Sequence, residues 1–232
     1  MSTASDSRAR PIIAVLGGTG AEGGGLALRW AHAGYPVVIG SRNPDKAARV
    51  CSRINAQLGT TLVSHDGYQG AAGTAHIVVL TVPYSAQRGT VEEIRDRLAG
   101  KILVDTTVPL VPPKVARVQL PEGGSAVAAI QALLGDTVKV VSAFQNVPAH
   151  LLQDLAHKVE CDVLVCGDDA AARESVIELA AAIGLRALHA GPIANSAAAE
   201  ALTSILISIN SRYKVPGGAG IRITRLKTSE QH

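Results

Sequence analysis

The sequence predicts a doubly wound α/β fold built on a parallel sheet. Apolar runs rich in valine and isoleucine recur along the 232 residues, and segments with helical periodicity separate most of them. The run Ile77-Val78-Val79-Leu80 contains no alternating polar residue, which is typical of a strand covered on both faces. Hydrophobic residues make up 47% of the chain and charged residues 18%, so we expect one well-formed α/β core.

The strands are expected where these apolar runs occur, because β-branched residues favour extended backbone. In chain order the predicted strands cover residues 12–16, 36–39, 61–64, 77–81, 102–104, 138–142 and 163–166.

Helices are expected between the strands, at residues 23–33, 44–58, 86–98, 127–134, 148–158 and 170–183. A last helix begins at Asn195 or Ser196, whose side-chain oxygens can cap its first turn. Its apolar residues share one helical face, namely Leu202, Ile205, Leu206 and Ile209. An apolar face of this kind favours pairing of subunits, so we expect a homo-oligomer, most simply a dimer.

The chain divides into three predicted parts. Residues 1–11 form a polar, flexible tail, residues 12–145 a nucleotide-binding domain, and residues 146–232 a smaller, mostly helical substrate-binding region. The opening residues lack the pattern of a signal peptide, and no run reaches the roughly 18 apolar residues of a membrane span. The 3 cysteines are an odd number in a chain large enough to fold without disulfides. We therefore expect a cytoplasmic protein without a membrane partner.

The charge balance argues against nucleic acid as a partner. The chain has 22 Lys and Arg against 19 Asp and Glu, a net charge of +3, and these residues form no basic block. Aromatic residues make up only 3% of the chain and are scattered, so they offer no platform for stacking bases.

A glycine motif follows the first predicted strand directly. Gly18, Gly20 and Gly23 form the pattern G-x-G-x-x-G and open a helix, which is the context of a dinucleotide-binding, Rossmann-type turn. The glycines permit a tight turn and close approach of a pyrophosphate to the free N–H groups at the helix start. We assign these glycines, with the intervening Ala21 and Glu22, to cofactor binding.

Two further glycines, Gly24 and Gly25, continue this motif into the helix. Each costs about 1 kcal/mol of helix stability relative to alanine. We therefore expect another segment to crowd the first turn of this helix.

The second predicted strand ends in Gly40-Ser41-Arg42-Asn43-Pro44, where a dinucleotide site selective for NAD would carry a carboxylate. Asn43 can cap the next helix and Pro44 suits its first turn, which brings Lys46 close to Ser41 and Arg42. A hydroxyl and two cations at a helix start suit a phosphomonoester. The expected cofactor is NADP, with two solvated basic residues as the alternative.

The binding crevice is expected at the carboxyl ends of the strands. We assign Thr81, Val82, Pro83 and Ala143 there to the cofactor. The loop after the sixth predicted strand also reaches this crevice, with Ser142, Phe144, Gln145, Asn146, Val147 and Pro148. These residues offer no acid–base pair, but they could hold two flat rings face to face, as hydride transfer between cofactors requires.

Other catalytic chemistry lacks its usual motifs. The chain has no G-x-S-x-G, H-E-x-x-H or C-x-x-C pattern, so we predict neither a catalytic nucleophile nor a metal site. Asp168 and Asp169 directly precede a predicted helix, which favours a capping role. His150 lies near the expected crevice and is a candidate substrate contact. The 3 cysteines are interpreted as inert core thiols.

Several segments of the chain together form a more specific pattern than the glycine motif: Gly17-Gly18-Thr19-Gly20, Gly25-Leu26-Ala27-Leu28-Arg29, Gly40-Ser41-Arg42, Lys46-Ala47, Val79-Leu80-Thr81-Val82-Pro83, Val141-Ser142-Ala143, Val165-Cys166-Gly167-Asp168-Asp169 and Ala190-Gly191-Pro192. In register from residue 12 to about residue 226, they resemble the NADPH-dependent reductases of the deazaflavin coenzyme F420. The run Gly40-Ser41-Arg42-Asn43-Pro44 is also similar to the reductase domain of six-transmembrane metalloreductases.

The resemblance implies a Rossmann-type oxidoreductase that transfers a hydride between NADPH and F420, with F420 as a co-substrate. It implies that Thr19 joins Ser41, Arg42 and Lys46 around the 2′-phosphate. It also implies that Gly218 and Ala219 wall the deazaflavin together with the 142–148 loop. Some family members carry histidine where this chain has Gln145 or Ala86, and a larger apolar residue in place of Ala219.

Two other functions remain compatible with these residues. An NADP-dependent reductase of the same fold could act on flavin or on a small carbonyl or imine, with His150 or Tyr84 as proton donor. A non-enzymatic NADP sensor would bind the dinucleotide without turnover.

Overall fold

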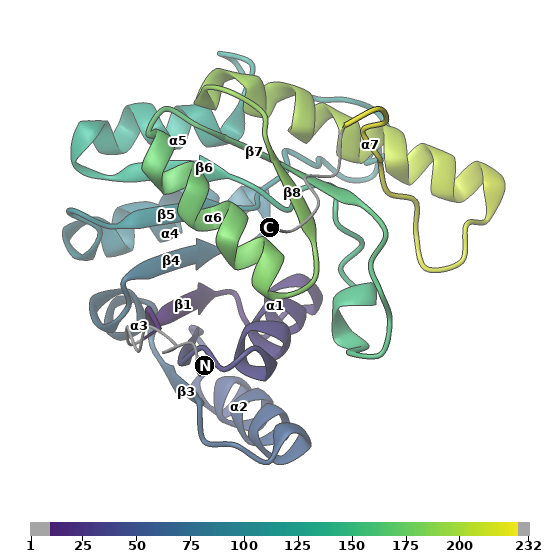
Figure 1. Cartoon of the computed structure of the whole chain (residues 1–232). Coiled ribbons are helices and arrows are strands. Elements are labelled where there is room, and N and C mark those ends of the chain that lie inside the picture. The colour runs from purple at the N-terminus through teal and green to yellow at the C-terminus, as the bar shows by residue number, and fades with distance from the viewer. Residues whose placement is uncertain (1–9, 227–232) are drawn as a thin grey trace, which may run out of the picture.

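The protein is described by a computed structural model that covers residues 10–226. Within these residues the strands form one eight-stranded sheet in the order β3-β2-β1-β4-β5-β6-β7-β8 (Figure 1). Neighbouring strands run parallel except for β6 and β7, which pair antiparallel. The doubly wound fold is confirmed. The strands are β1 (Ile13–Leu16), β2 (Val37–Gly40), β3 (Val63–Asp66), β4 (Ile77–Leu80), β5 (Ile102–Asp105), β6 (Lys139–Ser142), β7 (Asp162–Gly167) and β8 (Arg186–His189).

Helices cover both faces of this sheet. The α-helices of the described residues are α1 (Ala21–His32), α2 (Pro44–Leu58), α3 (Tyr68–Thr74), α4 (Tyr84–Ile94), α5 (Ala126–Leu134), α6 (Ala170–Ala182) and α7 (Ser196–Tyr213). One apolar cluster joins α1, α2 and α6 to the sheet, and a second joins α3, α4 and α5 to its other face. Along β1, Ile13 and Val15 enter the first cluster whereas Ala14 and Leu16 enter the second, as expected for a strand buried on both faces.

Local capping sets the ends of α2. The Oδ1 atom of Asn43 accepts a hydrogen bond from the Lys46 N–H at 2.9 Å, and Pro44 is the first helical residue. The helix ends before Gly59, which has φ +63°. These local signals explain why the predicted bounds of this helix are confirmed at both ends.

One predicted helix is wrong. Residues 148–158 form a loop that contains only the short 3-10 turn η3 (Leu151–Gln153). Four carbonyl groups of this loop accept hydrogen bonds from the Arg29 guanidinium. The backbone hydrogen bonds within the loop are isolated turns between residues three apart, such as the bond from the His157 N–H to the Asp154 carbonyl at 3.2 Å. A distant side chain therefore overrides the helical propensity of this segment.

Two elements were absent from the sequence prediction. Helix α3 has the sequence YQGAAGT, whose two glycines weaken the helical signal. Strand β8 is only four residues long, begins with Arg186 and ends with His189, so it lacks a continuous apolar run. It pairs with β7 alone at the edge of the sheet.

The region after residue 145 continues the same sheet through β7 and β8. Val163 and Leu179 share an apolar cluster with Leu26 of α1. Helix α7 then crosses the upper edge of the molecule in Figure 1, and the chain after it turns back toward the sheet. The division into a domain of residues 12–145 and a substrate-binding region of residues 146–232 stays a prediction, and most of the tail at 1–11 lies outside the described residues. No helix between residues 10 and 226 is both long and apolar enough to cross a membrane.

Candidate functional site

A cavity of about 850 Å³ opens at the carboxyl ends of β1, β4, β5 and β6. Its position confirms the expected crevice, because loops after parallel strands meet at this edge of the sheet. It brings together fifteen of the residues predicted for cofactor or substrate: Thr19, Gly20, Ala21, Glu22, Arg42, Lys46, Thr81, Val82, Pro83, Gln145, Asn146, Val147, Pro148, Gly218 and Ala219.

The structure places six predicted site residues outside the cavity lining: Gly18, Gly23, Ser41, Ser142, Ala143 and Phe144. Phe144 lies in the core, where its ring meets Trp30 edge to face with 6.0 Å between the centroids. Ser142 is fully buried, and its Oγ accepts a hydrogen bond from Gln145 at 2.8 Å. Both residues therefore support the substrate loop from behind instead of facing the cavity.

The glycine turn leaves the start of α1 open to an anion. A Cβ on Gly18 would lie 2.9 Å from the Val15 carbonyl oxygen, and one on Gly23 would lie 2.9 Å from the Gly17 carbonyl oxygen. Gly20 precedes α1 and offers no side-chain cap. Among residues 10–226 the first three N–H groups of α1 have no hydrogen-bond partner, so they suit a phosphate.

The loop at residues 148–158 supplies the crowding expected at Gly24 and Gly25. A Cβ on Gly25 would lie 2.5 Å from the Leu152 Cβ atom, far inside van der Waals contact. The Gln153 side chain donates a hydrogen bond to the Ala21 carbonyl oxygen at 2.6 Å. The glycine run thus lets a segment from the substrate side pack directly on the nucleotide-binding helix.

Arg29 of α1 holds this loop in place. Its Nε atom donates to the Leu152 carbonyl at 3.0 Å, and its Nη2 atom donates to the carbonyls of Leu151, Asp154 and His157 at 3.0, 2.6 and 2.9 Å. The side chain is buried, and burial lowers the pKa of its guanidinium although Asp154 opposes this shift. Our sequence interpretation gave Arg29 no structural role. The signal that could have indicated one is a cation between Leu28 and Trp30 in an otherwise apolar stretch of the helix.

A cationic corner borders the cavity at the start of α2. Arg42 and Lys46 are exposed and line the cavity, and among residues 10–226 neither has a carboxylate within ion-pair distance. The Ser41 Oγ accepts a hydrogen bond from the Asn43 N–H at 3.1 Å, so this hydroxyl shapes the turn. Two unpaired cations leave the corner available to a phosphate.

The substrate side presents two amide oxygens that need donors. The Gln145 Nε2 atom donates to the Asp105 carbonyl at 2.9 Å and to Ser142. The Asn146 Nδ2 atom donates to the Asp162 carbonyl at 2.7 Å. In the part of the chain that the structure describes, Gln145 Oε1 and Asn146 Oδ1 are buried without a partner. Both oxygens lie beneath the cavity surface, and unsatisfied buried acceptors of this kind are costly.

Three carboxyl groups that were not assigned an acid–base role lie at or behind this wall. Asp105 accepts hydrogen bonds from Gln87 at 2.6 Å and from the Thr107 N–H at 2.9 Å. Glu200 of α7 accepts from Ser125 and from the first N–H groups of α5. Burial raises the pKa of both groups, and it raises the pKa of Glu22 to about 8. Asp105 follows the fifth predicted strand at the expected crevice, whereas Glu200 was not singled out in the sequence because its partners on α5 are distant in the chain.

The remaining residues singled out in the sequence have other roles. Asp169 caps α6 by accepting from the Ala172 N–H at 2.7 Å, and Asp168 accepts from the Ile193 N–H at 2.9 Å. Residues 10–226 contain no group of His, Cys, Asp and Glu that could hold a metal ion. The cysteines are free and buried, and burial raises the pKa of Cys161 and Cys166 to about 11, so these thiols stay protonated.

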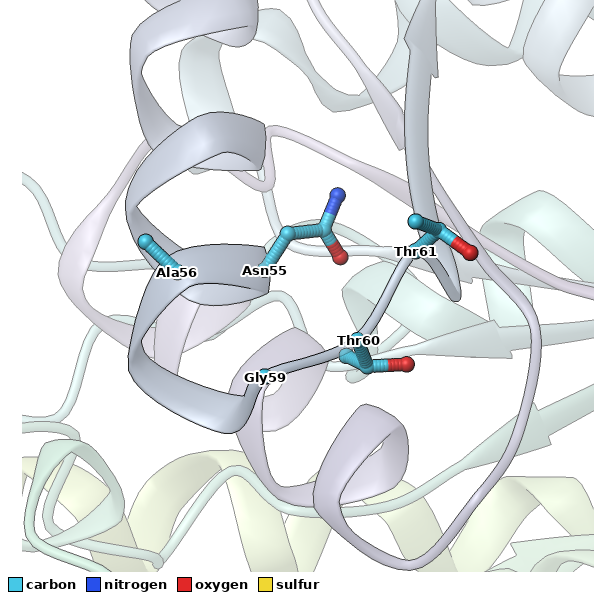
Figure 2. Close-up of a pocket in the computed structure, with 5 residues that line it drawn as sticks. All are labelled: Asn55, Ala56, Gly59, Thr60 and Thr61. Carbon is cyan, nitrogen blue, oxygen red and sulfur yellow. The ribbon is translucent and has the colours of Figure 1, made fainter.

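A second hollow lies where α2 ends and the chain turns toward β3 (Figure 2). Asn55 ties this turn to the backbone of Val63, donating to its carbonyl at 2.8 Å and accepting from its N–H at 3.0 Å. The other lining residues, Ala56, Gly59, Thr60 and Thr61, carry no ionisable group. The hollow has a structural explanation and is not a candidate site.

Comparisons with known proteins identify a matching family profile, similar proteins and a similar crystal structure. Residues 12–109 match the sequence profile described as NADP oxidoreductase coenzyme F420-dependent. The chain is 41% identical over 225 residues to the F420-dependent NADP reductase of Methanothermobacter thermautotrophicus, covering 94% of this chain and 97% of that protein. It is 31% identical over 206 residues to Metalloreductase STEAP3 of Rattus norvegicus, covering 89% of this chain but only 38% of that protein. A crystal structure from Arthrobacter sp. FB24 matches with a TM-score of 0.77 and 26% identity, covering 93% of this chain and 100% of the other.

Proposed function

Because the chain belongs to the family of coenzyme F420-dependent NADP oxidoreductases, we propose that it transfers a hydride between NADPH and F420 in the 850 Å³ cavity. The observation that supports this proposal is that one cavity is lined by the cationic corner, the glycine turn and the loop with Gln145 and Asn146. The glycine turn and the cationic corner suit a dinucleotide. The loop with Gln145 and Asn146 leaves room for a second ring system.

In this assignment Arg42 and Lys46 hold the 2′-phosphate of NADP, with Thr19 beside them on the cavity wall. The first turn of α1 binds the pyrophosphate through its free N–H groups. The deazaflavin is placed between the loop around Gln145 to Pro148 and the segment Gly218-Ala219. These residues position two ligands and exclude water, whereas the bound cofactors supply the redox chemistry. We assign no catalytic residue.

An acceptor panel tests this function. Purified protein is mixed with NADPH and, in separate reactions, with F420, FMN, FAD and small carbonyl compounds, and NADPH oxidation is followed at the nicotinamide absorbance band. We expect rapid oxidation with F420 only. Oxidation with a carbonyl compound instead would favour a reductase in which Tyr84 or His150, both on the cavity wall, donates a proton.

Arg42→Ala tests the cofactor assignment. We expect the KM for NADPH to rise on the order of tenfold or more while the KM for NADH stays unchanged, since a charge-assisted bond to the 2′-phosphate contributes about 1.5–3 kcal/mol. Arg53→Ala is the matched control, because Arg53 is exposed on the same helix and does not line the cavity. An equal rise for both nucleotides would contradict the phosphate assignment.

We further propose that the protein is a cytoplasmic homodimer. Ile205 and Tyr213 of α7 are 48% and 73% exposed, and such apolar surface favours pairing of subunits. The three free thiols suit a reducing compartment. Light scattering in solution should give twice the mass of one chain, and the mass of a single chain would contradict the dimer.

A further inference from the structure

Glu22 carries a carboxyl group where the proposed function puts two negative charges. It is the second residue of α1, it lines the cavity, and its side chain is half-buried. The N–H groups of the same helical turn are those that would receive the pyrophosphate. An ionised Glu22 and a bound diphosphate would therefore share the first turn of α1 on one cavity wall.

The surroundings of Glu22 oppose its ionisation. The start of a helix favours a carboxylate, and a hydrogen bond from Thr106 acts in the same direction. Burial outweighs the hydrogen bond from Thr106, and the nearby Asp105 carboxyl adds to the effect of burial, so that the pKa of Glu22 rises to about 8. Among the described residues Glu22 has no ion-pair partner.

The other charged and titratable groups on the cavity wall come from several elements. Arg42 and Lys46 lie on and just before α2, Tyr68 on α3, Tyr84 on α4 and His150 in the loop that follows β6. The two cations belong to the 2′-phosphate corner in the proposed assignment. They would be neutralised by that phosphate and leave Glu22 uncompensated once NADP is bound.

We propose that Glu22 binds the dinucleotide as a neutral acid, so that binding of NADP or NADPH takes up one proton at alkaline pH. The inference rests on the proposed function only in requiring a dinucleotide as ligand. A bound dinucleotide removes water from the cavity, which strengthens any repulsion between a carboxylate and the pyrophosphate. A protonated carboxyl group avoids this repulsion and can instead donate a hydrogen bond to a phosphate oxygen.

Proton linkage fixes the sign of the pH effect. In the free protein Glu22 loses its proton around its pKa of about 8, whereas the bound anion raises that pKa further. Below pH 7 both states hold the proton, so the affinity is independent of this group. Above pH 8 the free protein must take up a proton to bind, and the Kd rises up to tenfold per pH unit.

The Kd of NADPH is measured by titration calorimetry at pH 7, 8 and 9 for the wild-type protein and for Glu22→Gln, which keeps the shape and removes the charge. We expect the wild-type Kd to rise about tenfold between pH 7 and pH 9, and the Kd of Glu22→Gln to stay constant. NADH should show the same dependence, since it has the pyrophosphate but lacks the 2′-phosphate. Wild-type titrations in two buffers of different ionisation enthalpy should also reveal proton uptake at pH 9.

Three results would overturn the inference. A wild-type Kd that is flat from pH 7 to pH 9, the absence of proton uptake, or an equal pH slope in Glu22→Gln would each show that Glu22 does not bind as a neutral acid. The proton-uptake measurement needs only wild-type protein, so it decides the question even if the variant misfolds. Failure of the proposed function is distinguishable, because the acceptor panel measures turnover with F420, whereas this titration measures only binding of the dinucleotide.

Discussion

The two walls of the cavity are built in different ways. The nucleotide wall depends on neighbours in the chain: the glycine turn follows β1 directly, and Asn43 caps the helix that carries Lys46. The substrate wall depends on distant contacts: Arg29 holds a loop more than 120 residues further along, and the Gln145 amide is fixed by Asp105. The nucleotide wall should therefore tolerate substitutions elsewhere in the molecule. The substrate wall should lose its structure when the distant residues that hold it are substituted.

Arg29→Ala should disorder the substrate wall and cause the largest loss of stability among the substitutions considered. Four carbonyl oxygens lose the guanidinium donor, and among residues 10–226 only the Asp154 oxygen keeps another, the His157 N–H at 3.2 Å. Each buried unsatisfied group costs about 1–3 kcal/mol, partly recovered by entering water. We expect the free energy of unfolding to fall by about 3 kcal/mol or more, measured by urea denaturation. Among the molecules that remain folded, the KM for F420 should rise more than the KM for NADPH.

Arg29→Lys tests whether charge or geometry matters, because an ammonium group lacks the planar fork of a guanidinium. We expect an intermediate loss of stability. Exposed Arg53→Ala should leave both stability and kinetics unchanged, since its side chain lies away from the cavity. If Arg29→Ala is as stable as the wild-type protein, the loop is held by other contacts and the comparison of the two walls is wrong.

Gly25→Ala tests the contact between the walls themselves. The added methyl group gains helix propensity but meets Leu152 at 2.5 Å, so the loop must move. We expect a net loss of about 1–3 kcal/mol in thermal unfolding and a higher KM for F420. Gly24→Ala is the matched control, because its methyl group would come no closer than 3.3 Å to a neighbouring atom. Equal effects of the two substitutions would show that helix packing at this point does not position the loop.

The same contrast explains what could be predicted from the sequence. The central strands, α2 and the position of the cavity follow from apolar runs, caps and glycines that act within a few residues of one another. The loop at 148–158 has a helical pattern, but Arg29 donates hydrogen bonds to its carbonyl groups. A single sequence does not reveal that distant partner. Phe144 looks like a substrate contact by position, yet its pairing with Trp30 turns it into the core. These two predictions failed because a distant side chain decided the local structure, whereas α3 and β8 were missed because their own local signals are weak.

Asn43→Ala should have the smallest effect, because it disturbs the nucleotide wall through one local contact. Loss of the hydrogen bond from the Lys46 N–H to Asn43 Oδ1 removes an N-cap, which costs about 1 kcal/mol of stability. The first turn of α2 also carries Lys46, so we expect a modest rise in the KM for NADPH with the KM for F420 unchanged. Asn43→Ser restores a capping oxygen and should recover most of both losses. A change in the KM for F420 as large as that for NADPH would mean that the two walls are coupled through α2, and the local character of the nucleotide wall would then be wrong.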